Sequence, residues 1–495
     1  MRDLSPRRRS LVLAICCMSL LIVSLDNTVL NVALPSMRRD LDASVAGMQW
    51  TIDAYTLVLA SFLILAGSTA DRIGRRKVFT AGLVLFTAGS VLCSLAPGLG
   101  WLIGFRMLQA VGGSMLNPVA MSIIANTFTD PRERARAIGV WGAVVGVSMA
   151  AGPLIGGLLV DSVGWRSIFW VNLPVGLLAL GLTLRYVPES RAERPRRPDP
   201  VGQLLVMGLL GSLTYGIIEA PAAGPHSPLI LGCAALAVAC LAGLLVYESR
   251  RAEPLIDPRF FRSAPFTGAT VIAVSAFAAL SGFLFLNTLY LQDARGLGAL
   301  DAGLYMLPMA ALAFLCAPVS GRLVGSRGPR LPLLIAGVAM SASGLLFAAF
   351  SAESSTAMLF CGYVLFGLGF GMVNAPITNT AVSGMPRAQA GVAAAVASTS
   401  RQTGGTLGVA VVGAVLAAGL AGRAVPGAAA AAVSAADFVA AARPAWWIIT
   451  VCGLLVLVVG LATSGRWARG TAVRTARTLE REPDPTRAGS SPRRR

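Results

Sequence analysis

Two charged residues lie inside long apolar stretches of the sequence, where an unpaired charge is costly. Asp26 lies within the stretch 11–35, and Arg106 lies within 101–124. An ionisable side chain at such a depth costs about 2.5–3.5 kcal/mol on insertion scales, so we expect both side chains to face the interior of a helix bundle. Desolvation disfavours a charged carboxylate, so Asp26 is a candidate for proton exchange near neutral pH. The alternative is a structural carboxylate that accepts hydrogen bonds from a neighbouring helix.

These two charges have similar depths. At a rise of 1.5 Å per residue, Asp26 lies roughly 13 Å and Arg106 roughly 8 Å from the nearer ends of their stretches. A side chain spans that difference, so the two residues could pair or share polar neighbours, and the sequence leaves open whether they touch. A pair whose geometry depends on protonation would couple protons to motion, whereas a static pair would only join two helices.

The elements that carry these residues are long apolar segments. Hydrophobic residues make up 55% of the 495 residues and charged residues only 13%, against about 25% charged residues in soluble proteins. Segments of about 20 apolar residues can cross a bilayer as helices. We therefore expect an all-α polytopic membrane protein and exclude a soluble, secreted or fibrous one. The fourteen expected spans are 11–35, 48–69, 78–96, 101–124, 136–159, 166–187, 201–220, 228–247, 265–290, 301–323, 331–350, 355–379, 394–420 and 444–465.

The basic residues predict the orientation of these spans. With the N-terminus inside, 33 Lys and Arg fall in inside segments and 6 in outside segments. Cytoplasmic loops carry such an excess, so we expect both termini in the cytoplasm. The net charge of +18 then reflects topology and not nucleic-acid binding. The basic tail 466–495 is expected to be disordered and either solvated or in contact with anionic lipid.

A degenerate internal repeat predicts two halves. The sequences GSTADRIGRR at 67–76 and GRLVGSRGPR at 321–330 both follow the second span of a group of six. Many secondary transporters are built from such repeats around a central site. The expected parts are a cytoplasmic N-terminus (1–10), a six-helix half (11–187), two extra helices (201–247), a second six-helix half (265–465) and the tail (466–495).

The rare residues argue against cofactors and metals. The only lysine, Lys77, is followed by Val78, so the sequence has no P-loop. The single histidine, His226, and eight cysteines without a C-x-x-C pair predict no metal site and no disulfides. Since no nucleophile–base cluster is evident either, we do not expect an enzyme. Arginine outnumbers lysine by 40 to 1, which suggests a bacterium with a GC-rich genome.

The segment 136–159 is rich in glycine at helical spacing. Gly142 and Gly146, and again Gly152 and Gly156, have the G-x-x-x-G spacing that lets two helices approach closely. Pro153 removes a backbone hydrogen bond and bends a helix. The pattern predicts tight packing or a bend used in gating. Its members are Gly142, Gly146, Gly152, Pro153, Gly156 and Gly157.

Further polar residues are candidates for contacts within or between helices. A carboxylate at a helix C-terminus opposes the helix dipole, so we expect Asp71 to have an arginine or a helix N-terminus as its partner. Other polar side chains in the spans would either join helices or line a substrate path. They are Asn31, Asp53, Asn287, Asn374, Asn379, Arg401 and Gln402.

Together these motifs resemble the major facilitator superfamily, and within it the fourteen-helix drug:proton antiporter group. The helix 1 pattern runs from Leu25-Asp26 to Leu34-Pro35, and the helix 5 pattern is the glycine series above. The helix 4 motif is represented by Arg106, Gln109 and Gly112, with Ala110 where glycine is usual. The loop motif of the superfamily is represented by Gly67, Asp71, Arg72, Gly74, Arg75 and Arg76.

The resemblance implies the major-facilitator fold and proton-coupled export of lipophilic, often cationic drugs or antibiotics by alternating access. It assigns coupling to Asp26 and Arg106, a hinge to the helix 5 glycines, and a cytoplasmic latch to Asp71 with Arg72 and Arg75. The implied partners are a small-molecule substrate, protons and the bilayer of the cell membrane, with no cofactor and no nucleic acid. The alternatives are a dedicated exporter of one natural product, proton-coupled nutrient uptake, and a membrane sensor that transports nothing.

Overall fold

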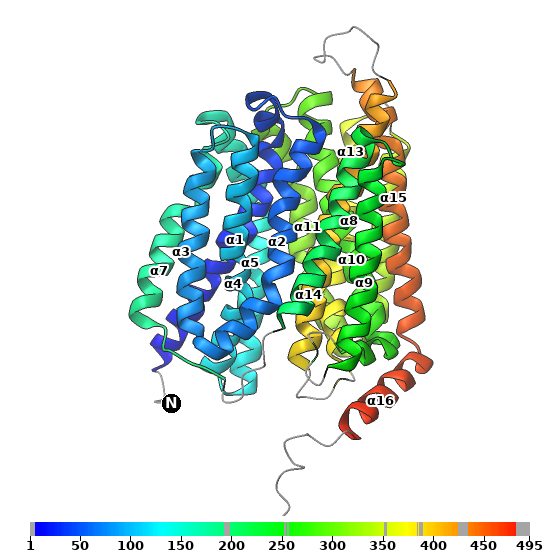
Figure 1. The fold of residues 1–495 in the computed structure, drawn as a ribbon. Coiled ribbons are helices and arrows are strands. Elements are labelled where there is room, and N and C mark those ends of the chain that lie inside the picture. The colour runs from blue at the N-terminus through cyan, green and yellow to red at the C-terminus, as the bar shows by residue number, and fades with distance from the viewer. Residues whose placement is uncertain are drawn as a thin grey trace, which may run out of the picture.

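The computed structural model is a bundle of long helices. It describes residues 5–192, 199–251, 254, 257–350, 354–383, 385, 390–423 and 434–481, and no strand occurs among them. Fourteen helices of this described part are long and apolar enough to cross a membrane. They form two groups that stand side by side, with a further helix, α16, inclined below one of them (Figure 1). The expected all-α fold with fourteen spans is confirmed.

The first group comprises seven helices, of which the last two share the sixth span. They are α1 (Pro6–Asp40), α2 (Val45–Ile73), α3 (Arg75–Ser94), α4 (Leu99–Thr127), α5 (Pro131–Ser162), α6 (Ser167–Trp170) and α7 (Asn172–Tyr186). The extra pair is α8 (Pro200–Ala223) and α9 (Pro228–Arg250). The second group is η1 (Pro258–Arg262), α10 (Ala264–Leu289), η2 (Tyr290–Ala294), α11 (Ala299–Arg327), α12 (Arg330–Ala348), α13 (Thr356–Val382), α14 (Ala390–Ala421), α15 (Ala435–Thr463) and α16 (Arg466–Arg481).

Local capping explains where many helices begin and end. The side chains of Ser44 and Asp130 accept hydrogen bonds from backbone N–H groups in the first turns of α2 and α5, which satisfies donors that a helix start leaves free. At the end of α2, Gly74 has a φ of 126°. A side chain is strained at that angle, so glycine lets the chain turn directly into α3.

Corresponding helix pairs pack together in the two groups. In the first group α3 packs on α4 and α2 on α4, and in the second α12 packs on α13 and α11 on α13. The pairs α1–α5 and α10–α14 also correspond. The two halves are thus variants of one packing scheme, which allows residues at equivalent points to be compared.

The extra pair packs beside the two halves. Helix α8 contacts both α2 and α14, and α9 packs on α8. The Gln203 amide donates a hydrogen bond to the Ser61 carbonyl, and Trp50 Nε1 donates to Glu219 Oε1 at 2.8 Å. The pair therefore covers the side of the bundle where α2 meets α14, although it lies between the halves in sequence.

The two halves meet mainly at one end of the bundle. We call the end that carries the N-terminus and α16 the terminal face, and the other end the opposite face (Figure 1). Among the described residues, most hydrogen bonds between the halves lie toward the opposite face. The Gln49 amide donates to the carbonyls of Val409 (3.1 Å) and Ala410 (2.8 Å), and Gln292 donates to that of Val32 (2.8 Å).

Two further contacts close the opposite face. The Asp161 carboxylate accepts hydrogen bonds from the backbone N–H groups of Ala299 (3.2 Å) and Leu300 (2.8 Å) at the start of α11. Arg38 forms an ion pair with Asp293 at 3.2 Å. A carboxylate at a helix N-terminus is favoured by the helix dipole. This conformation is therefore held closed at the opposite face.

The chain after the last span differs from the sequence prediction. We expected disorder over 466–495, but residues 466–481 form the helix α16, with Ala468, Ala472 and Leu479 buried. Residues 482–495 lie outside the described part. The composition, rich in Arg and Thr, concealed an apolar face at helical spacing. Helix α15 also begins at Ala435, nine residues before the expected start.

Candidate functional site

A buried ion pair occupies the core of the first half. Arg106 Nη1 of α4 donates to Asp26 Oδ2 of α1, and their side chains are 0% and 2% exposed. The other carboxylate oxygen accepts from Gln109 Nε2 (2.9 Å) and from Asn172 Nδ2 (2.9 Å). Both oxygens of Asp26 are therefore engaged, by side chains from α4 and α7. The two charges that the sequence placed at similar depths do touch.

Arg106 has further partners around its guanidinium. Nη1 also donates to Gln109 Oε1 at 2.7 Å, and Nε donates to the Thr51 carbonyl at 3.4 Å. The guanidinium carbon lies 4.2 Å from the ring centroid of Tyr55, a favourable cation–π geometry. Nη2 has no hydrogen-bond partner within the described chain. The two N–H groups of one nitrogen of a fully buried cation are thus without a hydrogen-bond partner among the described residues.

Ser90 of α3 links the cluster into a network. Its hydroxyl donates to the Phe169 carbonyl at 3.0 Å and accepts from Asn172 (2.9 Å) and Gln109 (3.3 Å). Sequence reasoning missed Ser90. Serine is common in membrane helices, so a single serine gives no signal. The cluster consists of Asp26, Ser90, Arg106, Gln109 and Asn172, and we call it the polar cluster.

Glycines allow the helices of the polar cluster to approach. A Cβ on Gly89 of α3 would lie 2.8 Å from the Cα of Gln109, and one on Gly112 of α4 would lie 2.8 Å from the Gly82 carbonyl oxygen. Such distances do not occur between real atoms of these kinds, so α3 and α4 meet through backbone. Gly112 of the helix 4 motif therefore sets the spacing of α3 and α4 that lets Gln109 reach Ser90.

The glycines of α5 pack on both halves. A Cβ on Gly156 would lie 3.1–3.2 Å from Val29 of α1, and one on Gly157 would lie 2.5 Å from Leu300 Cα of α11. Gly152 faces Thr28 of α1 and Gly146 faces Phe314 of α11 in the same way, whereas a Cβ on Gly142 would meet nothing within 4 Å. Close packing thus explains four of the five glycines. It joins the helix of Asp26 to the second half.

Residues of the predicted latch interact within the first half. The Asp71 carboxylate accepts from Arg75 Nε (3.0 Å) and Nη2 (2.7 Å), so its partner is an arginine of its own loop. The Arg76 backbone N–H donates to Glu189 at 3.1 Å, and its guanidinium donates to the Leu184 carbonyl. Arg72 is exposed, and Gly67 lies near Pro118 of α4. In this conformation the motif braces α2 and α3 against the chain after α7.

A small cavity lies where the halves meet. Its volume is about 10 Å³, and helices α1, α5, α10 and α11 supply the lining. Three of the lining side chains are methionines and three are polar. The lining residues are Thr28, Asn31, Val32, Met149, Pro153, Leu284, Thr288, Met306 and Met309. Of the polar residues considered for lining a substrate path, Asn31 is placed here. It is five residues after Asp26 on the same helix.

The remaining polar candidates are divided between core and surface. Asn287 is fully buried in the second half and accepts from Tyr363 Oη at 2.9 Å. It does not line this cavity, but its neighbour Thr288 does. Asn374 and Gln402 are half-buried and Asn379 is exposed. Arg401 is half-buried on α14, where it donates to Ser398 Oγ at 3.0 Å.

Asp53 is a second buried acid. It is 0% exposed, and neither carboxylate oxygen has a hydrogen-bond partner among the described residues. Gln49 and Thr56, four residues before and three after it on α2, both contact α14. Helical spacing therefore puts Asp53 on the face of α2 that packs against the second half. An unpaired buried carboxylate is costly when charged.

Comparisons with known proteins agree with this architecture. The family model described as Major Facilitator Superfamily matches residues 16–409. The multidrug resistance protein Stp of Mycobacterium tuberculosis is 39% identical over 84% of this chain and 77% of its own length. The tetracenomycin C resistance and export protein of Streptomyces glaucescens is 38% identical over 80% of this chain and 74% of its own length.

A solved structure has the same fold. It is that of a bacterial homolog to the human lysosomal transporter Spinster, in an inward-facing and unoccupied conformation. The TM-score is 0.66 at 20% identity, over 95% of this chain and 99% of the other. The predicted family is confirmed: the chain belongs to the major facilitator superfamily.

Proposed function

We propose that this protein exports lipophilic, often cationic drugs or antibiotics across the cytoplasmic membrane in exchange for protons. The observation that carries the proposal is the buried Asp26–Arg106 pair, because a carboxylate removed from water and held by one cation changes its interactions sharply on protonation. The proton gradient would supply the energy, at about 2.3 kcal/mol per charge per 100 mV. No cofactor and no chemical change of the substrate are required.

Helix α1 provides a direct route from proton to substrate. Asp26 lies two residues before Thr28 and five before Asn31, both of which line the cavity. Protonation of Asp26 would weaken its bond to Arg106 and free α1 to shift against α4. Thr28 and Val29 pack against Gly152 and Gly156 of α5. A shift of α1 would therefore reach the cavity and the contact between α5 and α11 together.

The cavity lining suits lipophilic compounds of varied shape. Met149, Met306 and Met309 are flexible and polarizable, a property that lets a site adapt to different ligands. A cavity of about 10 Å³ is smaller than any drug, so the halves must move apart to admit substrate. The contacts at the opposite face leave the terminal face as the side of entry. The excess of arginine predicts that this side is cytoplasmic, which is the side from which an exporter loads.

Ethidium extrusion from energised cells tests the proposal. We expect export by the wild-type chain, and at least about tenfold slower export with a protonophore or with Asp26→Asn, since a coupling step is lost. Asp42→Asn is the matched control, because Asp42 is an exposed aspartate at the opposite face and should not affect the rate. Membrane levels are compared by immunoblot. Equal export by Asp26→Asn and wild type, or export that survives the protonophore, would overturn proton coupling.

The relative named a tetracenomycin C resistance and export protein favours a second candidate, a dedicated exporter of one natural product. Growth of a susceptible host on a panel of unrelated toxic compounds separates the two. A broad pump raises tolerance to several chemical classes, and a dedicated exporter raises tolerance to one. If cells that carry the wild-type chain fail to extrude ethidium but gain tolerance to a single compound, the second candidate stands.

A further inference from the structure

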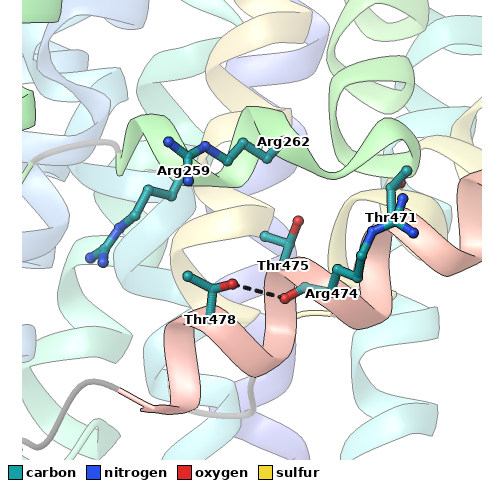
Figure 2. A pocket seen from close by; sticks show the side chains of 6 residues that line it. All are labelled: Arg259, Arg262, Thr471, Arg474, Thr475 and Thr478. Atoms are coloured by element: carbon teal, nitrogen blue, oxygen red, sulfur yellow. Dashed lines mark hydrogen bonds between the residues drawn. The ribbon is translucent and has the colours of Figure 1, made fainter.

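A basic pocket lies at the terminal face of the second half, away from the polar cluster and the substrate cavity. Its volume is about 180 Å³, and it separates η1 from α16. Figure 2 shows the lining side chains coming from η1 on one side and from α16 on the other. Three arginines and three threonines form the lining: Arg259, Arg262, Thr471, Arg474, Thr475 and Thr478. Among the described residues, no carboxylate lines it.

Helix α16 is fixed against the bundle, so the pocket has a defined shape. Leu479 is buried in a cluster with Phe260 of η1 and Phe266 of α10. Thr471 Oγ1 accepts a hydrogen bond from the Ala264 backbone N–H at 2.9 Å, at the start of α10. The pocket wall is therefore part of the folded bundle.

The charge of the pocket is positive and largely uncompensated. Asp257 binds Arg259 through Nε (3.0 Å) and Nη2 (3.0 Å), which offsets one of the three arginines. Arg262 and Arg474 have no carboxylate partner in the described part of the chain. Guanidinium groups and hydroxyls together are the donors that phosphate oxygens prefer, since the fork of arginine matches two oxygens at once.

The pocket lies where the membrane-spanning segments end. Helix α15 ends at Thr463 and α10 begins at Ala264, so both spans stop beside the pocket. Trp467 is one turn before Thr471 on the same face of α16 and is 68% exposed. Tryptophan is enriched at the membrane interface, and arginine-rich amphipathic helices lie in that plane. The phosphate layer of the bilayer would be at the level of the pocket.

We propose that the pocket between η1 and α16 binds a phosphate group carried by an anionic phospholipid. Basic pockets on the cytoplasmic side of membrane proteins recognise such headgroups. The adjacent exposed Trp467 and the ends of two spans favour a lipid over a soluble phosphate compound. A bound headgroup would bridge η1 and α16 and so stabilise the start of α10 and the end of α15.

Retention of lipid by the purified full chain tests the site. The chain is exchanged into detergent with phosphatidylglycerol or phosphatidylcholine, and bound lipid is counted by native mass spectrometry while the lipid concentration is titrated. We expect selective binding of phosphatidylglycerol, weakened about tenfold or more by the double variant Arg262→Gln/Arg474→Gln. The matched control is Arg469→Gln/Arg477→Gln, which removes two exposed arginines of the same helix that do not line the pocket. It should bind as the wild type does.

Two further arms make the outcome decisive. Thr475→Val keeps the packing volume of a buried residue and removes one hydroxyl, so a weaker loss should appear even if the double variant unfolds. Inorganic phosphate at millimolar concentration is offered as a competitor and as a stabiliser of the melting temperature. If phosphate alone binds and phosphatidylglycerol does not, the lipid source is overturned. If both double variants lose binding equally, general charge attraction explains the data. If neither loses binding, the lipid binds elsewhere. Either result overturns the site.

Discussion

Equivalent points in the cores of the two halves hold a charged pair in one and a neutral pair in the other. Arg106 is the eighth residue of α4, and Tyr363 is the eighth residue of α13. Arg106 donates to the carboxylate of Asp26, while Tyr363 Oη donates to the amide oxygen of Asn287 at 2.9 Å. Both pairs join the first helix of a half to its fourth. The repeat has thus kept a hydrogen bond at this place and changed its charge.

The residues around the two pairs differ in polarity as well. The Asp26 pair is completed by amide and hydroxyl groups, whereas Asn287 and Tyr363 lie among aromatic rings. Phe283 stacks on Phe366 with ring centroids 4.0 Å apart, and Phe347 stacks on Trp446 at 4.5 Å. A phenol–amide pair stays neutral across the physiological pH range. Under the proposed function, protons would therefore act on the core pair of the first half and not on that of the second.

Other features are common to both halves. Gly112 and Gly369 are each the fourteenth residue of their helix, and a Cβ on either would lie within 3.0 Å of the neighbouring helix. Ser90 of α3 and Ser343 of α12 each donate to a backbone carbonyl of another helix, although the acceptor lies on α6 in the first half and on α13 in the second. The helix spacing of the repeat is therefore shared, and the difference is confined to a few polar side chains. Six substitutions, in the two halves and at the contact between them, test that conclusion.

The largest effect is expected for Arg106→Gln. The buried Asp26 carboxylate then loses its cation, which should lower the free energy of unfolding by about 3–5 kcal/mol near neutral pH. An uncompensated buried carboxylate is less costly once it is neutralised, so the loss should shrink in acid. Asp26→Asn leaves Arg106 charged at any accessible pH, so its loss should not shrink. Denaturant unfolding in detergent at two pH values measures the loss in each variant. An equal change with pH in the two variants would refute the interpretation that Asp26 and Arg106 form a charged pair.

The corresponding change in the second half is Tyr363→Phe. It leaves the buried amide oxygen of Asn287 without its donor, which costs about 1–3 kcal/mol. Because neither partner carries a charge, the loss should be the same at pH 5 and pH 8. The same unfolding experiment measures it, and ethidium export should keep its dependence on the proton gradient. A pH-dependent loss here would remove the distinction between the halves.

This difference between the halves was only partly predictable. Asp26 and Arg106 stand out in the sequence because a charge in an apolar helix is rare and expensive, which is why their burial was expected. Asn287 was chosen for the same polarity, either to join helices or to line a substrate path, and it joins α10 to α13 through Tyr363. A helix that is apolar all round gives no indication of which side faces a cavity, so the position of Asn287 in an aromatic core required the structure.

The fold was more accessible than the contacts. Hydropathy fixes the number of spans because a bilayer demands about 20 apolar residues for each. The roles of Ser90 and of the Thr51 carbonyl have no sequence signal, since serine and backbone occur everywhere. The helix α16 was missed because composition was weighed there without periodicity. Ala468, Ala472, Thr475 and Leu479 have the spacing of one helix face, and all four are buried.

A smaller contrast is expected between the shared serines. Ser90→Ala removes a hydroxyl that takes part in three hydrogen bonds with the polar cluster and Phe169, so we expect a loss of about 1–2 kcal/mol. Ser343→Ala removes one hydrogen bond to the Gly362 carbonyl and should cost about 0.5–1 kcal/mol. Apparent melting temperatures in detergent rank the two. Only Ser90→Ala should also slow export, because it loosens Asn172 and Gln109 around Asp26; an equal slowing by both would contradict this.

The smallest effect is expected where the halves touch each other at their rim. Arg38 and Asp293 join α1 to the end of α10, but their side chains are 34% and 30% exposed. Solvent and salt weaken such a pair, so Arg38→Gln should change the balance between conformations by only about 0–1 kcal/mol. Cross-linking rates between cysteines placed at the opposite face, measured at low and high salt, would report this balance. The cross-linking rates of the wild type and the variant should become equal at high salt. A large, salt-resistant effect would mean that this rim pair, and not the contacts of Gln49 and Asp161, holds the halves together.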